Sequence, residues 1–139
     1  MSKEYTEEQR QARREASKRW KAKNKDKRRN SNRKWVANNP CKTLYLTMQR
    51  NSKKRGHELI LTYEEVQAIV EPMVCQMTGV SLAWDTEDWT PSIDRIDNQQ
   101  GYKPGNVRLV AWIVNRARAN GTDENLLRMA RGLVAHFGM

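Results

Sequence analysis

Asp94 and Asn115 combine the residue types and the spacing needed to hold a divalent cation. Their oxygens are hard ligands that suit Mg²⁺ or Mn²⁺, and a site with two protein ligands leaves coordination positions for water and a phosphate. They are 21 positions apart, so they can meet if the intervening chain folds back as a hairpin. One such ion could polarise a phosphate and neutralise the oxygen that leaves during hydrolysis. Metal-assisted cleavage of phosphodiesters is one chemistry that such a pair could support.

Two arginines follow Asn115 on the same predicted helix. Arg116 and Arg118 lie within one helical turn of it, where they would supply bidentate contacts to phosphate. An alternative interpretation is that Asp94 and Asn106 are ordinary turn residues, since Asp and Asn are common beside Gly and Pro.

The residues between the two candidate ligands have the pattern of a hairpin followed by a helix. Apolar and polar residues alternate from Ile93 to Ile96, which is typical of a strand. Turn-forming residues come next, a second apolar stretch follows, and a helix is expected from near Ala111. The turn residues are Asn98, Gly101, Pro104 and Gly105, and the second strand is marked by Val107, Leu109 and Val110.

The segments SIDRID, GY, NV and NRA resemble the hairpin of the HNH endonucleases, also called the ββα-metal or His-Me finger family, and especially of its small phage-type members. The resemblance covers residues 44–120. It implies that Asp94 is the acidic metal ligand, that Asn106 braces the loop, and that Asn115 completes the metal site. The fold class it implies is α+β, a small ββα-metal core with flanking helices and a basic helical N-terminal arm.

The resemblance breaks at Arg95, where the family usually has the His that serves as general base. Arg stays protonated at neutral pH and cannot take this role, so a clamp on the phosphorane oxygens suits it better. Asp97 shares a strand face with Arg95 and could accept a proton from a metal-bound water. His57, outside the matching motif, is the other candidate base. The predicted catalytic residues are Asp94, Arg95, Asp97, Asn106 and Asn115.

A second departure concerns zinc. Many HNH relatives carry a structural zinc held by two CxxC pairs, and the corresponding positions here read CQMTG from Cys75 and AWIV from Ala111. Only one of four thiols remains, and one Cys cannot build a tetrahedral zinc site. We therefore expect no structural zinc, with Ala111 and Val114 packed as ordinary core.

Length and composition limit the organisation of the chain. With 139 residues, 30% charged and 37% hydrophobic, there is room for one small domain and an appendage. We expect an arm over residues 1–40 and a nuclease-like domain over residues 41–139. The two cysteines make no close-spaced pair, and no apolar run precedes the charged residues, so we expect neither secretion nor a membrane partner, and a cytoplasmic location.

The charge is uneven along the chain. Residues 1–55 hold 19 Lys and Arg against 5 Asp and Glu, while residues 56–139 hold 7 against 11. A basic segment with so few aliphatic residues cannot bury enough surface to fold alone, so we expect it to be partly disordered or a marginal helix until phosphates neutralise it.

A weak repeat runs through this arm, because Trp20 and Trp35 lie in similar basic contexts fifteen residues apart. Fifteen residues make about four helical turns, so both rings would face nearly the same side of a continuous helix. An arm of this kind could track a nucleic-acid groove. The alternative is a solvated charge run whose Trp residues dock on the globular part. The predicted nucleic-acid-binding residues are Arg19, Trp20, Arg33, Lys34, Trp35, Arg116 and Arg118.

The remaining segments look like scaffold. A helix around Leu44 to Met48 should end at Gly56, a short strand should run over residues 57–61, and Thr62 with Glu65 forms a capping box for the next helix. After Thr122 a last helix carries an apolar stripe that we expect to be core, formed by Leu126, Leu127, Ala130, Leu133, Val134 and Phe137.

Together these features predict a metal-dependent endonuclease of the HNH type, acting on double-stranded DNA with one Mg²⁺ or Mn²⁺. The resemblance implies a phage or mobile-element setting such as homing, and hence a bacterial host cytoplasm. Three alternatives stay open: a DNA-binding protein that keeps the fold without the chemistry, an RNA-binding or ribosome-associated protein, and a factor that binds another protein.

Overall fold

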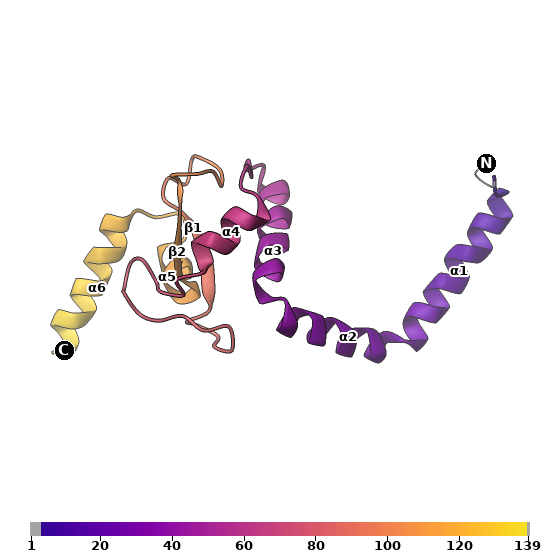
Figure 1. The fold of residues 1–139 in the computed structure, drawn as a ribbon, viewed down its shortest axis with the longest axis horizontal. Coiled ribbons are helices and arrows are strands. Elements are labelled where there is room, and N and C mark those ends of the chain that lie inside the picture. The colour runs from indigo at the N-terminus through magenta and orange to yellow at the C-terminus, as the bar shows by residue number, and fades with distance from the viewer. Residues whose placement is uncertain (1–3, 139) are drawn as a thin grey trace. The chain divides into compact units, whose positions relative to one another are not determined.

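The computed structural model describes residues 4–138, and the chain divides into two compact units, residues 1–39 and 40–139. The fold is α+β, with a small two-stranded sheet among helices (Figure 1). None of the helices within residues 4–138 has the length and apolar character needed to cross a membrane.

The first unit consists of two helices, α1 (Glu7–Lys23) and α2 (Lys25–Asn38). Thr6 begins α1 with a capping box that it forms with Gln9. The helix ends at Asn24, whose backbone N–H and side-chain Nδ2 both donate to the Trp20 carbonyl, at 3.0 and 2.8 Å. The single continuous helix assumed for the repeat is therefore interrupted at Asn24. Neither helix buries a residue, so neither gains much from packing.

The second unit begins with α3 (Pro40–Arg55) and α4 (Tyr63–Val70). Gly56 follows α3 with φ +71°, a conformation that favours glycine at a helix end. Thr62 and Glu65 form the predicted capping box of α4. The prediction of a strand over residues 57–61 is wrong: this segment makes one isolated bridge, from Leu59 to Tyr102, in which Tyr102 exchanges backbone hydrogen bonds with Glu58 and Ile60.

The hairpin comes next, formed by β1 (Pro91–Arg95) and β2 (Val107–Ala111) in antiparallel register, with Ile93 opposite Leu109. The chain then enters α5 (Trp112–Arg118) directly, and α5 packs against both strands. The predicted order of strand, loop, strand and helix is thus confirmed, including the start of the helix near Ala111.

The core lies where α3, α4 and the hairpin meet. Leu109, Val66, Val110 and Cys75 are its largest fully buried side chains. Burying one such aliphatic side chain is worth about 1.5–3 kcal/mol, so this cluster supplies much of the stability of the second unit. The other buried apolar residues are Met48, Leu61, Val70, Leu82, Ile93 and Ala111.

The last helix, α6 (Asp123–Phe137), projects from this core (Figure 1). It buries no residue, and Leu133 is 51% and Phe137 68% exposed. The prediction that its apolar stripe is core is therefore wrong. The physical reason is that α6 is attached through the polar contacts of Asp123 in its first turn, not through its apolar face.

Candidate active site

Asp94 lies on β1 with its side chain on the face that α5 covers. Side chains alternate across a strand, so Asp94 shares this face with Ser92. The carboxylate is 3% exposed, and arginines from two other elements contact it. Arg108 of β2 donates through Nε to Oδ2 at 2.9 Å, and Arg118 of α5 donates through Nη1 to Oδ1 at 3.2 Å.

Asn115 is held against the same strand, one helical turn before Arg118. Its Nδ2 donates to Ser92 Oγ at 2.8 Å and to the Ile93 carbonyl at 3.4 Å. Ser92 and Asp94 are alternate residues of β1, so their side chains point to the same face of the strand. Asn115, which bonds Ser92, therefore lies on the face that carries Asp94. The hairpin and α5 thus bring the two predicted ligands to neighbouring positions.

The two arginines also bind Asp123, at the start of α6. Arg108 forms a bidentate pair with this carboxylate, with Nη1 to Oδ2 at 2.7 Å and Nη2 to Oδ1 at 2.6 Å, and Arg118 Nε donates to Oδ1 at 2.6 Å. The hydrogen bonds from Arg108, aided by Arg118 and opposed by partial burial, lower the pKa of Asp123 to about 2. Asp94, Arg108, Arg118 and Asp123 therefore form a cluster of two carboxylates and two guanidinium groups, which we call the charge cluster.

Sequence reasoning missed Arg108. The hairpin register could have revealed it as a partner of Asp94, because the register places Arg108 directly opposite Asp94 on the neighbouring strand. Oppositely charged side chains attract each other at such positions. Register was the unknown, since Arg108 looks like an ordinary polar residue of an edge strand.

The donor chemistry at Asp94 and Asn115 fits one hard divalent ion. A carboxylate offers about four acceptor positions, so Asp94 Oδ1, with its single long contact to Arg118, keeps room for a further ligand. Asn115 uses its Nδ2 in hydrogen bonds, so Oδ1 is the atom of this side chain that could coordinate an ion. Within residues 4–138 no three His, Cys, Asp or Glu side chains gather to hold a metal, so an ion would depend on this carboxylate and amide pair. The adjacent positive charges of Arg108 and Arg118 would lower its affinity.

The loop between the strands is organised by Asn106, which is 6% exposed. Its Oδ1 accepts from the Asp97 backbone N–H at 2.8 Å, and its Nδ2 donates to the carbonyls of Asp97 and Gly101 at 3.1 and 2.9 Å. Arg95, 7% exposed, adds a second tie by donating through Nη1 to the carbonyls of Asn98 and Gln100. Both side chains thus fix the loop beside the candidate ligands.

Asp97 is exposed and forms a turn with the residues that follow it. Its oxygens accept from the Gln99 backbone N–H at 2.9 Å and from Gln100 Nε2 at 2.8 Å. These hydrogen bonds stabilise the charged form and lower its pKa, which makes the carboxylate a weaker base. Its predicted role as general base stays a prediction.

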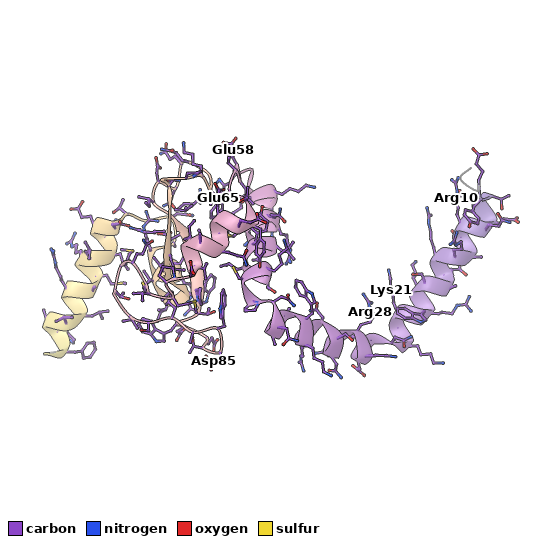
Figure 2. All side chains as sticks on the ribbon, viewed as in Figure 1. Arg10, Lys21, Arg28, Glu58, Glu65 and Asp85 are labelled. Atoms are coloured by element: carbon purple, nitrogen blue, oxygen red, sulfur yellow. The ribbon has the colours of Figure 1, made fainter. Side chains whose placement is uncertain are left out.

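His57 lies close to this loop. The adjacent Glu58 carbonyl accepts from the Tyr102 backbone N–H at 2.8 Å, and a side chain at Gly101 would collide with Glu58, labelled in Figure 2. The pKa of His57 is lowered by partial burial and then by the positive charges of Arg95 and Arg55. The imidazole is therefore neutral at pH 7, the form that can accept a proton.

The predicted phosphate contacts differ in exposure. Arg116 is exposed, whereas Arg118 is 6% exposed and gives its donors to the charge cluster and to the carbonyls of Arg95 and Ile96. The structure thus favours Arg116 over Arg118 as the residue that can reach a phosphate, because the donors of Arg118 are used within the protein. The predicted contacts on the arm are all exposed: Arg19, Trp20, Arg33, Lys34 and Trp35.

At the positions that correspond to the CxxC pairs of many HNH relatives, Cys75 and Ala111 are both fully buried. Gln76 links this turn to β2, since its backbone N–H donates to the Leu109 carbonyl at 2.8 Å and its Oε1 accepts from the Leu109 N–H at 2.7 Å. These hydrogen bonds give the turn a firm attachment to the hairpin.

The strand, loop, strand and helix that carry Asp94 and Asn115 form an HNH-like fold, and comparison with solved structures supports this. The structure of the rare-cutting HNH restriction endonuclease PacI, reported to perturb DNA, superimposes with a TM-score of 0.54 and 20% sequence identity, over 69% of this chain and 78% of that one. No protein-family model matches the chain, and no curated protein matches it.

Proposed function

We propose that this protein is a metal-dependent endonuclease that hydrolyses phosphodiester bonds of double-stranded DNA. The observation that carries the proposal is that Asp94 and the Asn115 amide, which bonds Ser92, lie on one face of β1 within an HNH-like fold. An oxygen ligand pair with open coordination positions suits one Mg²⁺ or Mn²⁺.

Asp94 and Asn115 would hold the ion, and the ion would supply charge neutralisation at the scissile phosphate. Asn106 and Arg95 keep the loop in place beside them, and Arg95 can add positive charge near the developing phosphorane oxygens. Arg116 and the basic arm would bind the DNA backbone. Asp97 or His57 would accept the proton of the attacking water. A phage or mobile-element setting in a bacterial cytoplasm belongs to this proposal.

The test is cleavage of supercoiled plasmid by purified protein with Mg²⁺ or Mn²⁺, and without either. Asp94→Asn and Asn115→Ala should abolish cleavage while far-UV circular dichroism stays unchanged. Calorimetric titration with Mn²⁺ gives a readout independent of turnover, and the same two variants should lose the binding event. Cleavage that survives both substitutions would rule out this site.

A second candidate function is DNA binding without catalysis. The charge cluster favours it, because Arg108 and Arg118 already neutralise Asp94, and so does Arg95 at the position where the family has its general base. Under this alternative the wild-type protein binds plasmid with a steep salt dependence but leaves it intact with every divalent ion tried.

A further inference from the structure

The first unit carries a groove of about 570 Å³ that spans the break between α1 and α2. Its lining residues recur at intervals of three and four, so they share one face of the two helices. Trp20 lies at one end of this face and Trp35 at the other. The full lining is Trp20, Asn24, Lys27, Arg28, Ser31, Asn32 and Trp35. We call this surface the Trp groove.

Both indole rings of the Trp groove are open to solvent. Trp20 is 59% and Trp35 43% exposed, although Trp is highly buried on average in folded proteins. The two helices bury no residue, so the rings contribute little to a core. Exposed aromatic rings at fixed positions are a platform for a flat apolar partner.

The charge around the Trp groove selects a polyanion. Residues 16–39 hold ten Lys and Arg against one acidic residue, Asp26. Lys27 and Arg28 line the groove between the two rings, and Figure 2 shows Lys21 and Arg28 on either side of the helix break. A partner must therefore offer planar apolar groups and negative charges in alternation. Single-stranded nucleic acid has this pattern, since unpaired bases stack on aromatic side chains while the phosphates contact cations.

We propose that the Trp groove binds unpaired bases of single-stranded DNA, with bases stacked on Trp20 and Trp35 and phosphates held by Lys27 and Arg28. Duplex DNA would contact the cations of the arm but would not stack on the indole rings, because its bases are already stacked on one another. The proposal rests on the proposed function only in the choice of DNA as the nucleic acid.

The test uses the full-length protein in EDTA, which prevents cleavage, with fluorescein-labelled dT20 and a hairpin duplex of equal charge as probes. Fluorescence anisotropy should show that Trp20→Ala and Trp35→Ala each weaken binding of dT20 by roughly 5- to 150-fold, the range for loss of one stacked base, and change duplex binding less than about twofold. Trp20→Phe should give an intermediate loss, since Phe keeps part of the stacking surface.

The matched control is Trp89→Ala, a tryptophan of the second unit that is 38% exposed, which should bind dT20 like the wild type. The double variant Lys27→Gln, Arg28→Gln should lower the slope of log affinity against log salt for dT20 by about 1.4, the expectation for two lost contacts to a single strand. Helicity is followed by circular dichroism in each variant.

Three results would overturn the proposal: unchanged dT20 binding in both Trp→Ala variants, an equal loss for dT20 and duplex, or a protein partner that dT20 fails to displace. Plasmid cleavage with Mn²⁺ separates it from the proposed function. If the protein does not cleave but the dT20 results are as expected, the Trp-groove proposal stands and the proposed endonuclease function fails. If it cleaves but the dT20 results fail, only the proposed function stands.

Discussion

Arg118 holds β1, the hairpin loop and α6 together, and its removal should be the most destabilising polar substitution in the second unit. The side chain is 6% exposed, and its guanidinium donates to acceptors on three segments. The acceptors are Asp94 Oδ1 at 3.2 Å, the Arg95 carbonyl at 3.0 Å, the Ile96 carbonyl at 2.6 Å, Asn98 Oδ1 at 3.5 Å and Asp123 Oδ1 at 2.6 Å.

The expected cost of Arg118→Met follows from these partners. Breaking a buried ion pair by removing one member costs about 3–5 kcal/mol, because the remaining charge stays buried. Asp94 keeps Arg108 as a partner, which lowers the cost, but two carbonyls lose their donor at about 1–3 kcal/mol each if water cannot replace it. The contact with Asp123 adds little, since that side chain is 39% exposed and screened by water. We expect a loss of about 3–5 kcal/mol in the free energy of unfolding.

Urea unfolding followed by tryptophan fluorescence measures this change, and the melting temperature should fall by more than about 10 °C. Arg116→Met is the matched control, because Arg116 is on the same helix but exposed. It should change stability by less than about 0.5 kcal/mol and instead weaken DNA binding. A loss below about 1 kcal/mol for Arg118→Met would refute the assignment of its donors to the protein interior.

Three further predictions concern the same region. Arg108→Gln removes one of the two positive charges beside Asp94, so Mn²⁺ affinity measured by calorimetry should rise by roughly tenfold or more; unchanged affinity would exclude Asp94 as a ligand. If Asp97 is the general base, Asp97→Ala abolishes cleavage without abolishing DNA binding. If His57 is the general base, His57→Gln has this effect instead, and cleavage by the wild type persists below pH 6.5 because the lowered pKa keeps His57 neutral there. Asp123 has a pKa of about 2 against an ordinary 3.8, so it stabilises the folded state above about pH 4 and loses this effect as pH falls toward 2; Asp123→Asn should flatten the dependence of stability on pH in that interval.

The local elements of this fold could be predicted from the sequence because each depends on neighbouring residues. The alternation around Ile93, the glycine at position 56 and the pair formed by Thr62 and Glu65 specify a strand, a helix end and a helix start without reference to the rest of the chain. The hairpin and α5 follow from such signals, and so does the placement of Asp94 and Asn115 toward one face of β1.

Features that depend on distant partners could not be predicted in this way. The stripe containing Leu133 and Phe137 identifies an amphipathic helix, but periodicity does not say whether another element covers it, and in this structure both side chains stay exposed. The break at Asn24 is local but equally hard to predict, because an Asn side chain can donate to the carbonyl four residues before it in many helices without ending them.

The charge cluster bears most directly on whether the chain cleaves DNA. A carboxylate that is only a metal ligand has no need of two arginines, while a carboxylate that is only structural has no need of an amide held on the same face of β1, at Ser92. The two arginines contact Asp94 itself, whereas Asn115 contacts Ser92 and the Ile93 carbonyl of the same strand. Arg118 is buried and donates to two carbonyls, so we expect it to stay in place. Arg108 is more exposed and also bonds Asp123, so it can release Asp94 to a metal ion and keep Asp123 as its partner. The metal affinity of Arg108→Gln therefore decides between a working nuclease site and a fold that has become a DNA-binding module.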